Sequence, residues 1–145
     1  MNKFVIVQIG HEEYGLSIKD VISIEKSISP NFVPQGPGYL RGIVEIRGTI
    51  QPVIDLNHLL FNEDTLITDK TRFIIVDNES KQYCLLVNDA REIMEISDED
   101  IKPFVQLDTS TSFVEGVVTA KQRLISLLNI KELLFSNIES VYSPV

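Results

Sequence analysis

The chain has 145 residues, with 13 basic and 21 acidic side chains and a formal net charge of −8. This length suits one domain or two very small ones, and 43% hydrophobic with 23% charged residues is a folded rather than a disordered composition. Residues 1–69 and 70–145 each carry a charge of −4, which disfavours nucleic acid and anionic membranes as partners. The longest apolar run, Tyr83–Val87, is too short to insert in a membrane, and the single Cys84 excludes an internal disulfide. We therefore expect a soluble, cytoplasmic protein.

The first half of the chain predicts short β-strands separated by turn residues. In chain order these strands are Phe4–Val7, Val21–Glu25, Ile43–Ile46 and Thr49–Ile54. A short helix, Leu56–Phe61, is expected next, with Asp55 as its N-cap. The polar stretch Asn62–Thr71 then separates the two halves.

The second half repeats the first. A shift of 69 residues aligns Phe4 with Phe73 and Tyr14 with Tyr83, and a shift of 74 aligns Gly42 with Gly116. The corresponding strands are Phe73–Val76, Ile93–Ile96, Val117–Thr119 and Leu124–Leu128. About five short strands in roughly 65 residues are typical of a small closed barrel.

We therefore predict a single all-β domain over residues 1–145, built from two tandem five-stranded barrels that pack together. The first subdomain is expected over about residues 8–62 and the second over about 72–135. A C-terminal helix is expected over about residues 129–140, because Asn129 and Glu132 fit a capping box and an apolar stripe follows. This helix should brace an apolar junction between the barrels.

Motifs that would indicate catalysis are missing from the sequence. There is no Gly-x-Ser-x-Gly elbow and no phosphate-binding loop, and the two histidines, His11 and His58, have no second ligand at helix spacing. Asp55 is more simply explained as a helix cap than as a catalytic carboxylate. The sequence indicates a binding module with no catalytic residue, cofactor or metal; a small acidic enzyme using Asp55 or His58 remains the rival hypothesis.

One stretch, residues 42–56, indicates a partner-binding surface. Strand alternation places Ile43, Glu45 and Arg47 on one face, while Val44 and Ile46 face the core. An exposed isoleucine beside a charged pair, next to a glycine turn, suits protein recognition, although a merely solvated strand face is the alternative.

The same stretch resembles the signature of the CheW-like family, the coupling proteins of bacterial chemotaxis. The resemblance covers Phe4 to Leu134 and is carried by three motifs. They are Gly10-His11-Glu12-Glu13-Tyr14-Gly15, Tyr39 to Gly48 followed by Pro52-Val53-Ile54-Asp55-Leu56, and Arg123-Leu124-Ile125 with Leu127-Leu128-Asn129-Ile130.

This resemblance implies two SH3-like barrels, with the first strand, about residues 3–7, crossing to the second barrel. It implies a non-enzymatic adaptor without cofactor that connects chemoreceptor cytoplasmic tips, docked between the barrels, to the regulatory domain of a histidine kinase. Such an adaptor is recruited to receptor arrays at the inner membrane face. Positions matching family residues implicated in kinase contact or coupling are Val21, Gly42 and Arg47. A same-fold adaptor for a non-chemotaxis kinase pathway, such as pilus motility, remains the alternative.

Two positions depart from the family pattern. Ser23 and Glu45 stand where the family commonly has Glu and Asn. The usual Glu is thought to pair with the signature arginine, so Ser23 leaves Arg47 without that partner. Glu45, two residues away on the expected strand face, is the predicted replacement.

Overall fold

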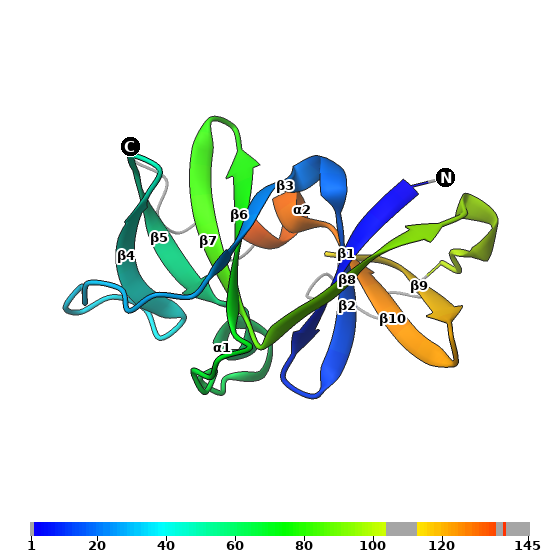
Figure 1. Ribbon diagram of the computed structural model, residues 1–145, viewed down its shortest axis with the longest axis horizontal. Coiled ribbons are helices and arrows are strands. Elements are labelled where there is room, and N and C mark those ends of the chain that lie inside the picture. The colour runs from blue at the N-terminus through cyan, green and yellow to red at the C-terminus, as the bar shows by residue number, and fades with distance from the viewer. Residues whose placement is uncertain (1, 104–112, 136–137, 139–145) are drawn as a thin grey trace.

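The computed structural model describes residues 2–103, 113–135 and 138. Strands make up most of this part of the chain, and Figure 1 shows them in two groups. The strands are β1 (Asn2–Ile9), β2 (Glu12–Ser17), β3 (Val21–Lys26), β4 (Leu40–Ile46), β5 (Thr49–Asp55), β6 (Arg72–Asn78), β7 (Lys81–Val87), β8 (Asp89–Ile96), β9 (Val114–Ala120) and β10 (Arg123–Leu128). The helices are α1 (Leu56–Phe61) and α2 (Ile130–Leu134), with short 3-10 turns η1 (Ile18–Asp20) and η2 (Asp98–Asp100). No helix of the described residues is both long and apolar enough to span a membrane.

The strands form two five-stranded mixed sheets, which confirms the prediction of a mostly β protein. Sheet A has the order β8-β1-β2-β10-β9, and sheet B has the order β3-β6-β7-β5-β4. Each contains one parallel pair, β2 with β10 and β5 with β7. When β1 to β5 are matched with β6 to β10, both sheets have the same strand order, as the internal repeat requires.

The predicted division of strands between the two units is wrong. The first subdomain was expected over residues 8–62, but β2 belongs to sheet A with β8, β9 and β10. The second was expected over residues 72–135, but β6 and β7 complete sheet B. The two copies therefore exchange whole hairpins, whereas only the first strand was expected to cross. Because the hairpins are repeat-equivalent, each supplies the same edges and apolar faces to either sheet.

Three apolar clusters explain why the strongest strand signals are unbroken hydrophobic runs. Phe4 and Ile6 of β1 face the interior of sheet A, whereas Val5 and Val7 face sheet B. Strands buried on both faces need apolar residues at every position. The largest cluster, the junction core, lies between the sheets; its buried members are Val5, Val7, Ile9, Leu16, Ile54, Leu56, Ile74, Val76, Tyr83, Leu85, Val87, Leu128, Ile130, Leu133, Leu134 and Ile138.

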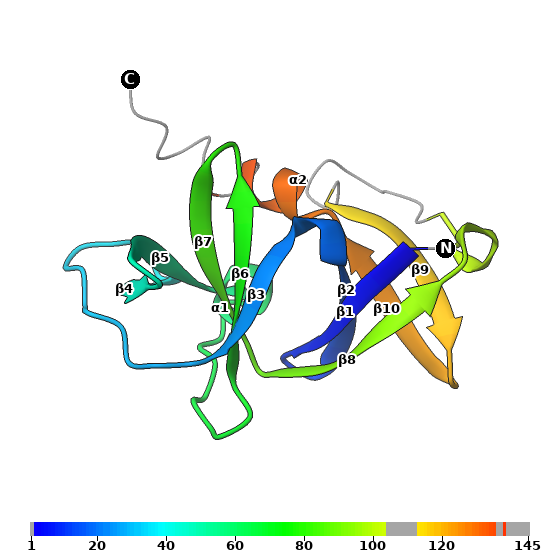
Figure 2. The same cartoon turned by 45° about the horizontal axis from the view of Figure 1, so that its top comes forward.

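The helix after β10 contributes to this junction core, as predicted. The side chain of Asn129 accepts a hydrogen bond from the backbone N–H of Glu132 at 3.0 Å, so the N-cap is confirmed. Ile130, Leu133 and Leu134 of α2 are fully buried against both sheets, and Figure 2 shows α2 beside the junction. The predicted helix extends to about residue 140, and most of its last turns lie outside the described residues.

Candidate functional site

The outer face of β4 has the predicted alternation. Ile43 and Glu45 are exposed, while Val44 is buried in the interior of sheet B. Arg47 does not continue this face, because β4 ends at Ile46 and Arg47 begins the turn to β5 with a φ of +54°. A left-handed conformation is uncommon for a residue with a side chain, and together with Gly48 it forms the tight turn that matches hairpin twist.

Arg47 forms its ion pair with Glu25, not with the predicted Glu45. The guanidinium Nη2 lies 3.0 Å from Oε2 of Glu25, on β3, and 72% of the Arg47 side chain remains exposed. Glu25 stands opposite the buried Phe73 on β6, so its carboxylate points toward the interior of sheet B. The Arg47 side chain therefore extends from the end of β4 across to β3, the opposite edge strand of sheet B. The prediction failed because β3 and β4, the two edges of sheet B, meet only when the sheet curls.

The second half of the chain carries an ion pair at the repeat-equivalent place. Glu92, which aligns with Ser23, lies 3.1 Å from the ammonium of Lys121, which aligns with Arg47. Arg123 adds a 2.8 Å hydrogen bond to Glu92, and this bond is the main cause of the lowered pKa of that carboxyl. In sheet B, position 23 is a serine and cannot supply this acidic partner. Glu25, two residues further along the same face of β3, supplies it instead.

Gly42 contacts another segment of the chain rather than presenting an open surface. Its φ is +139°, and a Cβ at this position would lie 2.2 Å from the carbonyl oxygen of Asn31. Asn31 forms two backbone hydrogen bonds with Ile43, both of 2.9 Å, so the connection between β3 and β4 is fixed against the edge of β4. The signature glycine therefore acts on the shape of this edge, which the sequence alone did not indicate.

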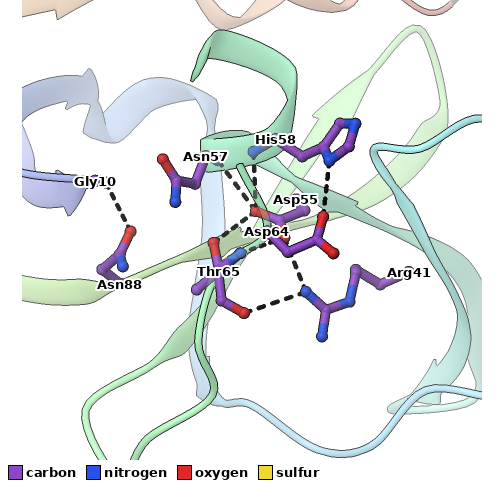
Figure 3. Close-up of polar contacts among 8 residues, drawn as sticks. All are labelled: Gly10, Arg41, Asp55, Asn57, His58, Asp64, Thr65 and Asn88. Atoms are coloured by element: carbon purple, nitrogen blue, oxygen red, sulfur yellow. Dashed lines mark hydrogen bonds and ion pairs between the residues drawn. The ribbon is translucent and has the colours of Figure 1, made fainter. Parts of the chain in front are cut away.

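A buried polar network anchors the end of the same hairpin. Asp55 accepts hydrogen bonds from the backbone N–H groups of Asn57 and His58, which confirms its predicted role as N-cap of α1. Figure 3 shows Arg41 and Thr65 converging on the same carboxylate; Arg41 Nη1 lies 2.9 Å from Oδ2, and the Thr65 hydroxyl donates at 2.6 Å to Oδ1. A fully buried carboxylate with five donors is a structural anchor.

Arg41 reaches Asp55 because of an irregularity in β4. The pairing of β4 with β5 shifts register between Leu40 and Gly42, so Arg41 is an extra residue in the strand. A bulge of this kind redirects the side chain, here toward the carboxylate at the end of β5. The rival hypothesis of an enzyme using Asp55 loses its main residue, because this carboxylate is already committed to the fold.

The side chains of His58 and Cys84 also have positions that the fold explains. His58 Nδ1 lies 2.7 Å from a carboxylate oxygen of Asp64. Cys84 is fully buried in the interior of sheet B, and burial, with a smaller contribution from the Glu25 carboxylate, raises its pKa to about 12. Among the described residues, no group of three or more His, Cys, Asp or Glu side chains could hold a metal ion.

The edges of the junction between the sheets carry exposed isoleucines. Ile24 on β3 is paired with Ile74, and Ile93 on β8 is paired with Val5; both partners belong to the junction core. Paired residues of antiparallel strands point to the same side, so Ile24 and Ile93 face the junction although 40% and 54% exposed. Val21, a predicted partner-binding residue, is half-buried and packs against the junction core rather than lying on the outer face of β4.

This geometry defines a binding module: exposed apolar side chains and the largely exposed Arg47 lie on a framework whose buried polar groups serve the fold. The family model of the CheW-like domain matches residues 3–137. "Chemotaxis protein CheW" of Bacillus subtilis (strain 168) is 32% identical over 130 residues, which cover 88% of this chain and 83% of that protein. "Probable chemotaxis protein CheW" of Rhizobium etli is 29% identical over 140 residues, covering 95% and 90%.

A solved structure has the same fold. The scaffolding protein TtCheW from Thermoanaerobacter tengcongensis superposes with a TM-score of 0.83 at 30% sequence identity, covering 92% of this chain and 87% of that one. The chain therefore belongs to the CheW-like family, and its function is that of a chemotaxis coupling and scaffolding protein, not of an enzyme.

Proposed function

We propose that this chain couples chemoreceptor cytoplasmic tips to the regulatory domain of a histidine kinase, beside receptor arrays at the inner membrane face. The observation that carries the proposal is the end of sheet B, where Ile43 is exposed and Arg47 is tethered by Glu25. Arginine forms directional, fork-shaped contacts, and the ion pair restricts its side chain before a partner arrives. We assign the kinase regulatory domain to this end, with Ile43, Glu45 and Arg47 as contacts and Gly42 as the residue that shapes the edge.

The receptor tip is assigned to the junction between the sheets. Ile24 and Ile93 extend the junction core to the surface from two different sheets. A helix with an apolar stripe suits this part of the junction, because the apolar side chains of such a helix can contact Ile24 and Ile93 at the same time. Val21, packed against the junction core, supports the shape of this part of the junction.

The proposal is tested by calorimetry with the purified chain, a kinase regulatory domain and a peptide containing a receptor tip. We expect each partner to bind alone and the second to bind a complex already saturated with the first, because the two surfaces are different. Ile24→Ser should weaken receptor-tip binding and leave kinase binding unchanged. Failure of the wild-type chain to bind either partner would contradict the proposed function, and strict competition between them would contradict the two separate surfaces.

A further inference from the structure

The most exposed large apolar side chain of the described residues belongs to Phe32, with 80% of its surface accessible. It lies in the connection between β3 and β4. Figures 1 and 2 show this connection extending past β4, at the end of the molecule opposite β9 and β10. An aromatic ring held in water contributes nothing to the core, and aromatic side chains are enriched among the residues that dominate binding energies at interfaces.

The backbone next to Phe32 is fixed. Asn31 is paired with Ile43 by two hydrogen bonds, and Gly42 lies so close beneath it that no Cβ fits. The backbone of Phe32 is therefore held at the edge of β4, one residue past Asn31, which is the pairing partner of the exposed Ile43. A side chain whose backbone is already ordered loses less conformational entropy when a partner covers it.

We infer that Phe32 is an anchor residue of the kinase-docking face, continuous with Ile43 and extending that face beyond β4. This inference rests on the proposed function, and it commits to the kinase regulatory domain as the occupant. Ile43 and Arg47 are four residue steps apart, which corresponds to about 13 Å in an extended strand. The partner surface then offers an apolar pocket for the Phe32 ring and, about that far away, an acidic group for the largely exposed Arg47 guanidinium.

The same arrangement gives Gly42 an indirect role. Any side chain at this position displaces the carbonyl of Asn31 and with it the neighbouring Phe32. Gly42 is then a positioning residue that acts through Phe32. Its substitution weakens kinase binding without removing a direct contact.

The test compares the affinity of the kinase regulatory domain for the wild-type chain, Phe32→Ala and the control Phe135→Ala, which truncates another exposed phenylalanine, directly after α2. We expect Phe32→Ala to raise Kd at least about tenfold and Phe32→Tyr to restore most of the affinity. Unfolding and receptor-tip binding should be unchanged, because Phe32 is exposed and outside the junction. Phe135→Ala should bind like the wild type.

The possible outcomes separate this inference from the proposed function. If the wild-type chain does not bind the kinase domain, the proposed function and the role of Phe32 are both wrong. If the wild type binds and Phe32→Ala binds equally well, only the role of Phe32 is wrong. If Phe32→Ala changes only the concentration dependence of self-association, measured by sedimentation, the face belongs to a second copy of the chain and the inference is also overturned.

Discussion

The guanidinium of Arg47 lies 3.0 Å from the carboxylate of Glu25 and joins the two edge strands of sheet B. Glu25 belongs to β3 and Arg47 follows β4, at opposite ends of the strand order. The contact therefore bridges the open side of the curled sheet. Because Arg47 is mostly exposed, we expect the pair to orient the guanidinium more than it stabilises the fold.

A double-mutant cycle on the free energy of unfolding tests this pairing. Arg47→Ala and Glu25→Ala should be coupled by no more than about 1 kcal/mol, the value of an exposed ion pair. Arg47→Ala and Glu45→Ala should be additive, because Arg47 is paired with Glu25 and not with Glu45. Urea denaturation of the single and double variants measures both couplings. A coupling of Arg47 with Glu45 that exceeds its coupling with Glu25 would contradict the observed geometry.

Gly42→Ala should destabilise the fold much more than Gly48→Ala. Both glycines have positive φ, but a Cβ on Gly42 meets the Asn31 carbonyl at 2.2 Å, whereas one on Gly48 meets nothing within 4 Å. Backbone strain alone costs about 1 kcal/mol at Gly48, and strain with displacement of the Asn31 segment costs about 2–4 kcal/mol at Gly42. Thermal and urea unfolding of the two variants give the comparison. Equal losses would show that the Asn31 segment moves freely.

Asp55→Ala should be among the most destabilising polar substitutions in the chain. It leaves the Arg41 guanidinium without its carboxylate and the Thr65 backbone N–H without an acceptor. Breaking a buried pair of this kind costs about 3 kcal/mol or more. The control is Asp64→Ala, which removes an exposed carboxylate next to Thr65 that is paired with His58, and for which we expect a change within about 0.5 kcal/mol. Similar unfolding free energies for the two variants would exclude the proposed anchor.

Glu92 predicts a specific dependence of stability on pH. Hydrogen bonds from Arg123 and Lys121 lower its pKa below the ordinary 4.5. A lowered pKa in the folded state means that the stabilisation is fully present above about pH 4.5 and is lost as the pH falls through the folded pKa. The difference in unfolding free energy between the wild type and Glu92→Gln should therefore shrink on acidification. Glu99→Gln, which removes an exposed carboxylate of the same charge, is the control; a parallel loss in both variants would exclude a specific pair.

The sequence predicted where strands form but not which sheet each one joins. Runs such as Phe4–Val7 and Phe73–Val76 are apolar on both faces, and the eight strands expected by residue range are all present, whereas no range was predicted for β2 or β7. Because the two halves are repeats, the β1–β2 and β6–β7 hairpins carry nearly the same pattern. Their exchange between sheets depends on long-range packing at the junction core, which local patterns do not encode.

The candidate site was likewise predictable only where its features depend on the local sequence. The alternation along β4 correctly predicted that Ile43 and Glu45 are exposed. The position of Asp55 before an apolar run correctly predicted its role as a helix cap. Glu25 and Asn31 were missed as partners of Arg47 and Gly42, because they come from β3 and the connection after it. Their contacts exist only once sheet B curls and the connection folds back on β4.

The measurement that tests the central claim most directly is calorimetric titration of the kinase regulatory domain into the wild-type chain and Arg47→Ala. We expect Arg47→Ala to raise Kd at least about tenfold, with receptor-tip binding unchanged and the free energy of unfolding lowered by no more than about 1 kcal/mol. Arg91→Ala removes another exposed, ion-paired arginine, on sheet A, and should bind the kinase domain like the wild type. Identical affinities for Arg47→Ala and the wild type would contradict the assignment of this end of sheet B to the kinase.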